Sequence, residues 1–190
     1  SAYSAEASYN NLYPYFAVAK HELKWINVPQ SFGGNFYHRI KMGKTGMLKT
    51  DVTYSQSTSK LDYSNFNSKY NTIGLTNKNL FVKSNYITNL NKKWFLKVGV
   101  SYNNNKDVKK LDSDKLSEKL GSLHARFGLV NYRNNKTTIK TGVEGFTLGS
   151  QFQYSIDSSP AQYSLNSTDL ITSGYLETDI KLSKKTALRI

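Results

Sequence analysis

Residues 94–102, WFLKVGVSY, decide the fold of this 190-residue chain. Apolar or aromatic side chains stand at every second position of the stretch, and Phe95, Lys97, Gly99 and Ser101 stand between them. A period of two is typical of a β-strand, because successive side chains in a strand point to opposite faces. The apolar face is aliphatic in the middle and aromatic at both ends, and Trp and Tyr favour membrane–water boundaries. A tilted strand of this length, at about 3.3 Å for each residue, crosses roughly the 25 Å apolar band of an outer-membrane barrel.

The composition agrees with a sheet that is apolar on one side only. Hydrophobic residues make up 38% of the chain and aromatic residues 13%, which is poor in aliphatic residues for a soluble domain. A barrel that is apolar outside and polar inside dilutes its hydrophobicity in this way, because half of each strand faces water. No apolar run is long enough to predict a transmembrane helix. The chain has no Cys, which excludes a disulfide framework and a thiolate metal site.

The formal net charge of +13 allows two interpretations. It can indicate an anionic partner such as nucleic acid, lipopolysaccharide or an acidic ligand. It can also arise from lysines scattered over loops and a water-filled lumen. The basic residues form no single tract, which favours the scattered arrangement and argues against nucleic acid.

Alternating side chains predict about nine strands in one domain over residues 1–190. The expected strands cover residues 15–25, 31–42, 48–54, 79–88, 94–102, 120–132, 137–154, 169–182 and 186–190. We assign no element to residues 1–12. Residues 27–30, which include Pro29, predict a turn, because Pro cannot serve a central position in a strand ladder.

The connections between these strands fall into two classes. Tight turns are predicted at residues 43–46, 89–92, 133–136 and 183–185, and long polar loops at residues 55–78, 103–118 and 155–168, with room for a short helix at 113–120. Short turns at one end and long loops at the other are typical of outer-membrane barrels. A Greek-key sandwich does not sort its loops by length in this way. The sequence therefore predicts an all-β, antiparallel transmembrane barrel.

The strand count predicts an incomplete barrel. Bacterial single-chain barrels close with an even number of strands. The count of about nine is odd, and the strand from residue 186 is cut short. We therefore expect a curved, unclosed sheet that is part of a larger barrel.

The alternation divides candidate residues between two faces. The residues expected to face lipid are Trp94, Leu96, Val98, Val100, Tyr102, Phe127, Leu129 and Leu176. The residues expected to face the lumen are Arg39, Lys41, Lys97, Arg126, Lys140, Glu144, Glu177 and Asp179. We interpret the carboxylates of the second set as charge partners of nearby lysines and arginines in a wet lumen.

We predict no catalytic, cofactor or metal site. Gly43-Lys44-Thr45 matches the end of a phosphate-binding loop, but His38 stands where that motif needs a Gly. The histidines lack ligand spacing, and no Gly-x-Ser-x-Gly motif is present. The chain is therefore expected not to be an enzyme, with an outer-membrane hydrolase as the weaker alternative.

Residues 25–54, WINVPQSFGGNFYHRIKMGKTGMLKTDVTY, resemble the early barrel region of TonB-dependent outer-membrane receptors of the Bacteroidetes type. The resemblance rests on Pro-x-Ser-Phe-Gly-Gly-Asn at 29–35 and Gly-Lys-Thr-Gly-Met at 43–47, and residues 169–190 are similar to a later barrel stretch. It implies a 22-stranded barrel around a plug domain in a Gram-negative outer membrane. It also implies TonB-dependent import of an unidentified ligand. No plug is visible in these residues, so no ligand-binding or coupling residue is carried over.

The implied partners are outer-membrane lipid and lipopolysaccharide, the TonB complex through a plug region, and a surface lipoprotein. Nucleic acid is not among them. Two alternatives stay open besides the hydrolase: a small closed outer-membrane barrel and a soluble β-sheet module for binding or adhesion. The ligand cannot be read from strand alternation, because loops and plug determine it.

Overall fold

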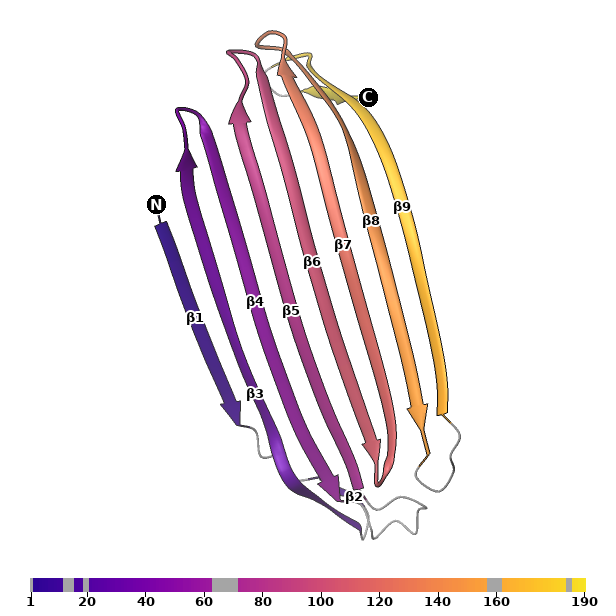
Figure 1. Ribbon diagram of the computed structural model, residues 1–190. Coiled ribbons are helices and arrows are strands. Elements are labelled where there is room, and N and C mark those ends of the chain that lie inside the picture. The colour runs from indigo at the N-terminus through magenta and orange to yellow at the C-terminus, as the bar shows by residue number, and fades with distance from the viewer. Residues whose placement is uncertain (1, 12–15, 19–20, 63–71, 157–161, 184–185) are drawn as a thin grey trace.

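A single antiparallel β-sheet makes up the described part of the chain (Figure 1). The computed structural model describes residues 2–11, 16–18, 21–62, 72–156, 162–183 and 186–190, with side chains from residue 25 onward. The described residues contain no helix long and apolar enough to cross a membrane, a finding that concerns helical spans alone. The all-β antiparallel fold expected from the sequence is confirmed.

Ten strands form the sheet, and nearly all of them follow one another as hairpins. The spatial order is β1-β3-β4-β5-β6-β7-β8-β9-β10, with β2 beside β3. The strands are β1 Ala2–Asn11, β2 Phe16–Val18, β3 His21–Met42, β4 Gly46–Asp62, β5 Thr72–Asn89, β6 Trp94–Leu111, β7 Asp114–Tyr132, β8 Thr137–Ser155, β9 Gln162–Lys181 and β10 Ala187–Arg189.

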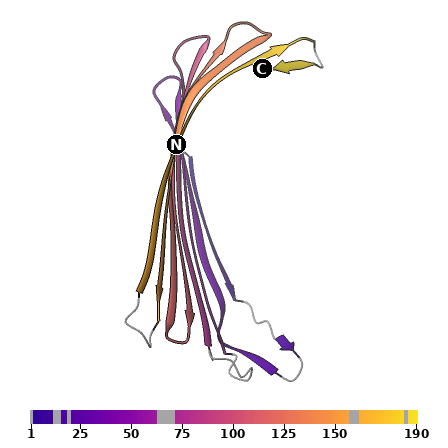
Figure 2. The same cartoon turned by 90° about the vertical axis from the view of Figure 1, so that its right-hand side faces the viewer.

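The sheet is a single curved layer whose two edges do not meet. β1 pairs with β3 and β10 pairs with β9, so the described strands leave the sheet unclosed. The layer bends over at the end that carries the short turns (Figure 2). Among the described residues, Val130 is the buried hydrophobic residue, at 5% exposure. A sheet with so little internal core must be covered by its surroundings to remove its apolar face from water.

The strands are longer than the sequence pattern predicted, and all three predicted long loops are shorter. β6 and β7 are joined by residues 112–113 alone, where Asp112 adopts the left-handed region with φ of 54°. The short helix considered at 113–120 is wrong, because β7 begins at Asp114. Much of 55–78 and 155–168 is also strand. A strand that is polar on both faces carries no hydrophobic period, so alternation could not reveal these parts.

The N-terminal region also departs from expectation. β1 occupies residues to which we assigned no element, and β3 runs through Pro29 where a turn was predicted. The register shifts between Trp25 and Asn27 and again between Asn27 and Gln30, and such irregularities accommodate a Pro within a strand. The strand expected at 15–25 is divided between β2 and β3, and residues 15, 19 and 20 lie outside the described residues.

Three of the predicted tight turns lie within one residue of their expected positions, and two of these turns share a local physical cause. The side-chain oxygen of Asn91 accepts hydrogen bonds from the backbone N–H groups of Lys93 and Trp94, at 2.9 and 3.0 Å. Asn134 repeats the arrangement with the N–H groups of Lys136 and Thr137, at 2.8 and 2.7 Å. Such side-chain bonds replace the ladder bonds that end at a turn. Of the last predicted turn, residues 184–185 lie outside the described residues.

Candidate functional site on the concave face

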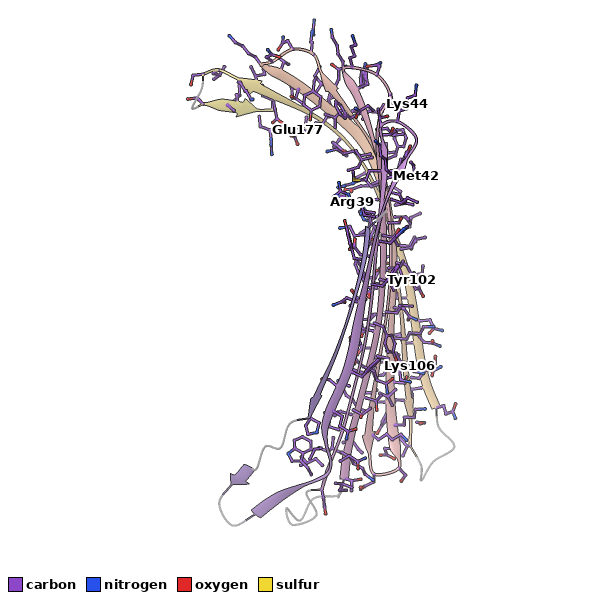
Figure 3. All side chains as sticks on the ribbon, turned by 90° about the vertical axis from the view of Figure 1, so that its left-hand side faces the viewer. Arg39, Met42, Lys44, Tyr102, Lys106 and Glu177 are labelled. Carbon is purple, nitrogen blue, oxygen red and sulfur yellow. The ribbon has the colours of Figure 1, made fainter. Side chains whose placement is uncertain are left out.

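Strand register places the charged candidate residues on one face of the sheet. Arg126 pairs with Glu144, and Lys140 pairs with Glu177. Arg39 and Glu177 both lie on the concave side of the sheet, although Arg39 belongs to β3 and Glu177 to β9, near opposite edges (Figure 3). The candidate residues on this concave face are Arg39, Lys41, Lys97, Arg126, Lys140, Glu144, Glu177 and Asp179.

The apolar candidates share the opposite, convex face. Leu96 pairs with Leu129, and Val98 pairs with Phe127. Tyr102 lies on this side in Figure 3. The face is open to its surroundings, since the exposed fraction is 72% for Leu176. The candidates here are Trp94, Leu96, Val98, Val100, Tyr102, Phe127, Leu129 and Leu176.

A charge cluster lies on the concave face near the short-turn end. The Lys140 ammonium group donates to a carboxylate oxygen of Glu177 and to one of Asp179, each at 2.5 Å. Arg189 of β10 approaches the same carboxylates, at 3.0 and 2.7 Å. The cluster joins β8, β9 and β10, so it holds the short strand β10 against the rest of the sheet. The expected pairing of these carboxylates with lysine and arginine is therefore present for Glu177 and Asp179.

A second cluster lies further along the same face. Glu144 accepts a hydrogen bond from the Ser173 hydroxyl at 3.1 Å, and its other oxygen lies 3.2 Å from Nε2 of His124. We expected lysine or arginine as its partners, but these two contacts come from a histidine and a serine. A hydrolytic triad needs the histidine between the nucleophile and the carboxylate. Here the carboxylate stands between the hydroxyl and the imidazole, so the group does not form such a triad.

The sequence interpretation missed an amide ladder between β5 and β6. The Asn77 amide donates to Asn105 at 3.0 Å and to Asp107 at 2.5 Å, and Asn79 donates to Asn103 at 3.2 Å. Apart from Asn79, which begins the strand expected at 79–88, these residues lie in the stretches taken for loops, so their facing could not be assigned. The alternation of Asn103, Asn105 and Asp107 was the available signal.

The ladder and the Glu144 cluster border one depression of the concave face. Its volume is about 730 Å³. The residues that line it include Asn79, Phe81, Asn103, His124, Glu144 and Phe146. Amide, imidazole and carboxylate groups beside phenyl rings can bind a polar solute by hydrogen bonds and stacking. No group of three or more His, Asp or Glu suited to a metal ion occurs among the described residues.

Comparison with known proteins gives a likeness of structure. No protein-family model and no curated protein matches the chain. The structure is similar to that of the ferric yersiniabactin uptake receptor FyuA from Yersinia pestis, with a TM-score of 0.52 and 10% sequence identity. The match covers 86% of this chain and 27% of that receptor, so the chain spans about a quarter of its length. At this identity the likeness shows the fold alone: an antiparallel sheet that resembles part of an outer-membrane barrel.

Proposed function

We propose that this chain forms part of the barrel wall of an uptake receptor in a Gram-negative outer membrane. The observation that carries the proposal is the contrast between the two faces of a single-layer sheet. The convex face exposes Leu170 at 69% and Leu176 at 72%, whereas the concave face carries the charge clusters and the amide ladder. Lipid on the convex side would remove the exposed apolar side chains from water, and water on the concave side would solvate the charged and amide groups.

The direction of the wall follows from its connections. In outer-membrane barrels the short turns lie in the periplasm and the longer connections lie outside. In this proposal the turns at 43–45, 90–93 and 133–136 lie in the periplasm and the opposite strand ends lie outside the cell, although the β6–β7 connection at that outer end, residues 112–113, is short as well. The strands have 17–22 residues between β3 and β9. A tilted strand needs about 9–11 residues to cross the bilayer, so the rest extends beyond the membrane.

Import is the activity that we attach to this wall. Its supports are the resemblance of residues 25–54 to TonB-dependent receptors and the likeness of structure to a ferric yersiniabactin receptor. In this proposal the ligand is polar and passes the depression beside Glu144. A plug region contacts the TonB complex, a surface lipoprotein assists capture, and the outer wall contacts lipopolysaccharide. No catalytic step is assigned to the chain.

The test uses the full protein in its own cells. Outer-membrane fractions should contain it in a form whose electrophoretic mobility changes on heating, as folded barrels show. Uptake of ⁵⁵Fe-labelled ferric chelates is then compared between the parent strain and a gene deletion, with and without a protonophore. Loss of energy-dependent uptake on deletion is the expected result. Recovery of the protein in a soluble fraction would refute the proposal that the chain forms part of a barrel wall. A folded membrane protein whose deletion causes no uptake defect would refute the import of ferric chelates.

A further inference from the structure

The convex face changes character beyond its apolar band. Lys78 pairs with Lys106, and Lys106 pairs with Lys119, so three lysines stand side by side on β5, β6 and β7. Their side chains are exposed, and Lys106 lies on the same side of the sheet as Tyr102 (Figure 3). Adjacent strands are about 4.8 Å apart, so the positive charges are crowded. A second row, further from the short turns on the same face, contains Lys60, Lys110 and Lys115.

Carboxylates do not neutralise this row. Within the described strands β5–β8, the convex face carries no Asp or Glu. Strand carboxylates that share the concave face are Asp51, Asp107, Asp114, Glu118, Glu144, Asp169, Glu177 and Asp179. No ion pair among the described residues involves Lys78, Lys106 or Lys119. Like charges directly opposite one another destabilise a sheet, so anions from outside the chain would stabilise the row.

The aromatic residues beside the row indicate its level in the membrane. Tyr54 contacts Phe32 with ring centroids 6.4 Å apart, and its hydroxyl donates to Gln56 at 2.9 Å. Gln56 pairs with Lys78, so the polar tip of Tyr54 points toward the lysine row. Tyrosines orient in this way at the boundary between hydrocarbon and headgroups. In the proposed barrel wall, this arrangement puts the lysines at the level of the lipid headgroups.

A depression of about 430 Å³ adjoins the row. It is lined by residues that include Tyr102, Asn104, Lys119, Gly121 and Gln151. A Cβ added at Gly121 would meet nothing within 4 Å, so the space above this glycine is open. The side-chain oxygen of Asn104 is buried and has no hydrogen-bond partner within the described residues. A buried acceptor without a donor is costly, and a ligand hydroxyl or amide N–H would satisfy it.

We propose that the Lys78–Lys106–Lys119 row and the depression beside Asn104 bind the phosphorylated sugar headgroup of lipopolysaccharide in the outer leaflet. The inference rests on the proposed function, which places this end of the strands outside the cell. Phosphates neutralise the lysine row, and the hydroxyl and amide groups of the sugars supply donors for Asn104. The second row meets phosphates further from the bilayer.

The experiment measures lipopolysaccharide bound to the full protein. The triple variant K78Q/K106Q/K119Q is compared with K44Q/K92Q/K93Q, which removes the same charge from the opposite end of the sheet. Each purified protein is titrated with lipopolysaccharide in mixed detergent micelles, and heat-modifiable migration establishes that the barrel is folded. A lysine near an anionic surface contributes about fivefold in affinity, so the first variant should bind about 100-fold more weakly. The control and K78R/K106R/K119R should bind like the parent protein.

Two further arms identify the ligand chemistry. Dephosphorylated lipopolysaccharide should bind weakly to the parent protein, and N104L should lower affinity for the intact molecule without changing its salt dependence. Equal binding of lipopolysaccharide by the parent and by K78Q/K106Q/K119Q would overturn the proposal. It would also be overturned if the parent bound phosphatidylglycerol micelles as tightly as lipopolysaccharide, or if it bound an acidic protein or nucleic acid tightly instead. These results would leave a folded outer-membrane barrel in place. A soluble parent protein would instead refute the proposed function itself.

Discussion

Replacing Val100 by arginine should destabilise the folded protein in a bilayer by about 2–4 kcal/mol. Val100 lies on the convex face, midway along β6 between Trp94 and Lys106. Its cross-strand neighbours are Ser84 and Ala125, so the new side chain meets little steric conflict. The cost therefore comes from transferring a charge into hydrocarbon. It corresponds to a change of roughly 30- to 700-fold in the unfolding equilibrium.

The matched control is the same substitution at Val108. This residue lies on the same strand and face but beyond Lys106, so V108R should cost only about 0–1 kcal/mol. Both variants of the full protein are unfolded with guanidinium chloride in phosphatidylcholine vesicles, and tryptophan fluorescence reports the transition. Costs that agree within about 0.5 kcal/mol would show that depth in the membrane has no influence. That result would refute the assignment of the convex face to lipid.

Three further predictions concern the concave face and the orientation of the sheet. G142V should destabilise the protein by about 1–3 kcal/mol, because a Cβ at Gly142 would lie 2.5 Å from the backbone oxygen of Phe127 and 2.7 Å from the Tyr175 hydroxyl. Adding Y175A removes only the second contact, so it should recover part of the loss in the same denaturation assay. K140M should cost about 1 kcal/mol at low salt and less in 1 M NaCl, because its two carboxylate contacts are partly exposed and salt screens them; an unchanged difference in high salt would contradict an electrostatic origin. Since the chain has no native Cys, a membrane-impermeant maleimide added to intact cells should label S113C but not K92C, and the reverse pattern would invert the proposed topology.

Local sequence was informative wherever one face of a strand is apolar. Residues 94–102 alternate strictly, and the structure places them in β6 as expected. The tight turns were equally predictable, because Asn91 and Asn134 bond to backbone N–H groups a few residues further along the chain. Both features depend on short-range rules: the period of two in a strand and the side-chain chemistry of turns.

The same rules failed where polar residues cover both faces. The Asn77–Asp107 contact joins β5 and β6 in stretches that appeared to be loops, because ladder hydrogen bonds, not apolar burial, hold these parts of the strands. The passage of β3 through Pro29 was missed for a related reason. A register shift beside the proline lets the strand continue, and such a shift depends on the neighbouring strand.

The sequence by itself determined which residues alternate and where the chain turns, and these two properties place the charged candidates and the apolar candidates on opposite faces. Tertiary structure decided which residues stand next to one another across the strands. Lys78, Lys106 and Lys119 look scattered along the chain, yet they form one row on the convex face. The physical reason is register: hairpin geometry and the hydrogen-bond ladder fix how far each strand slides past the next, and that offset is a property of pairs of strands.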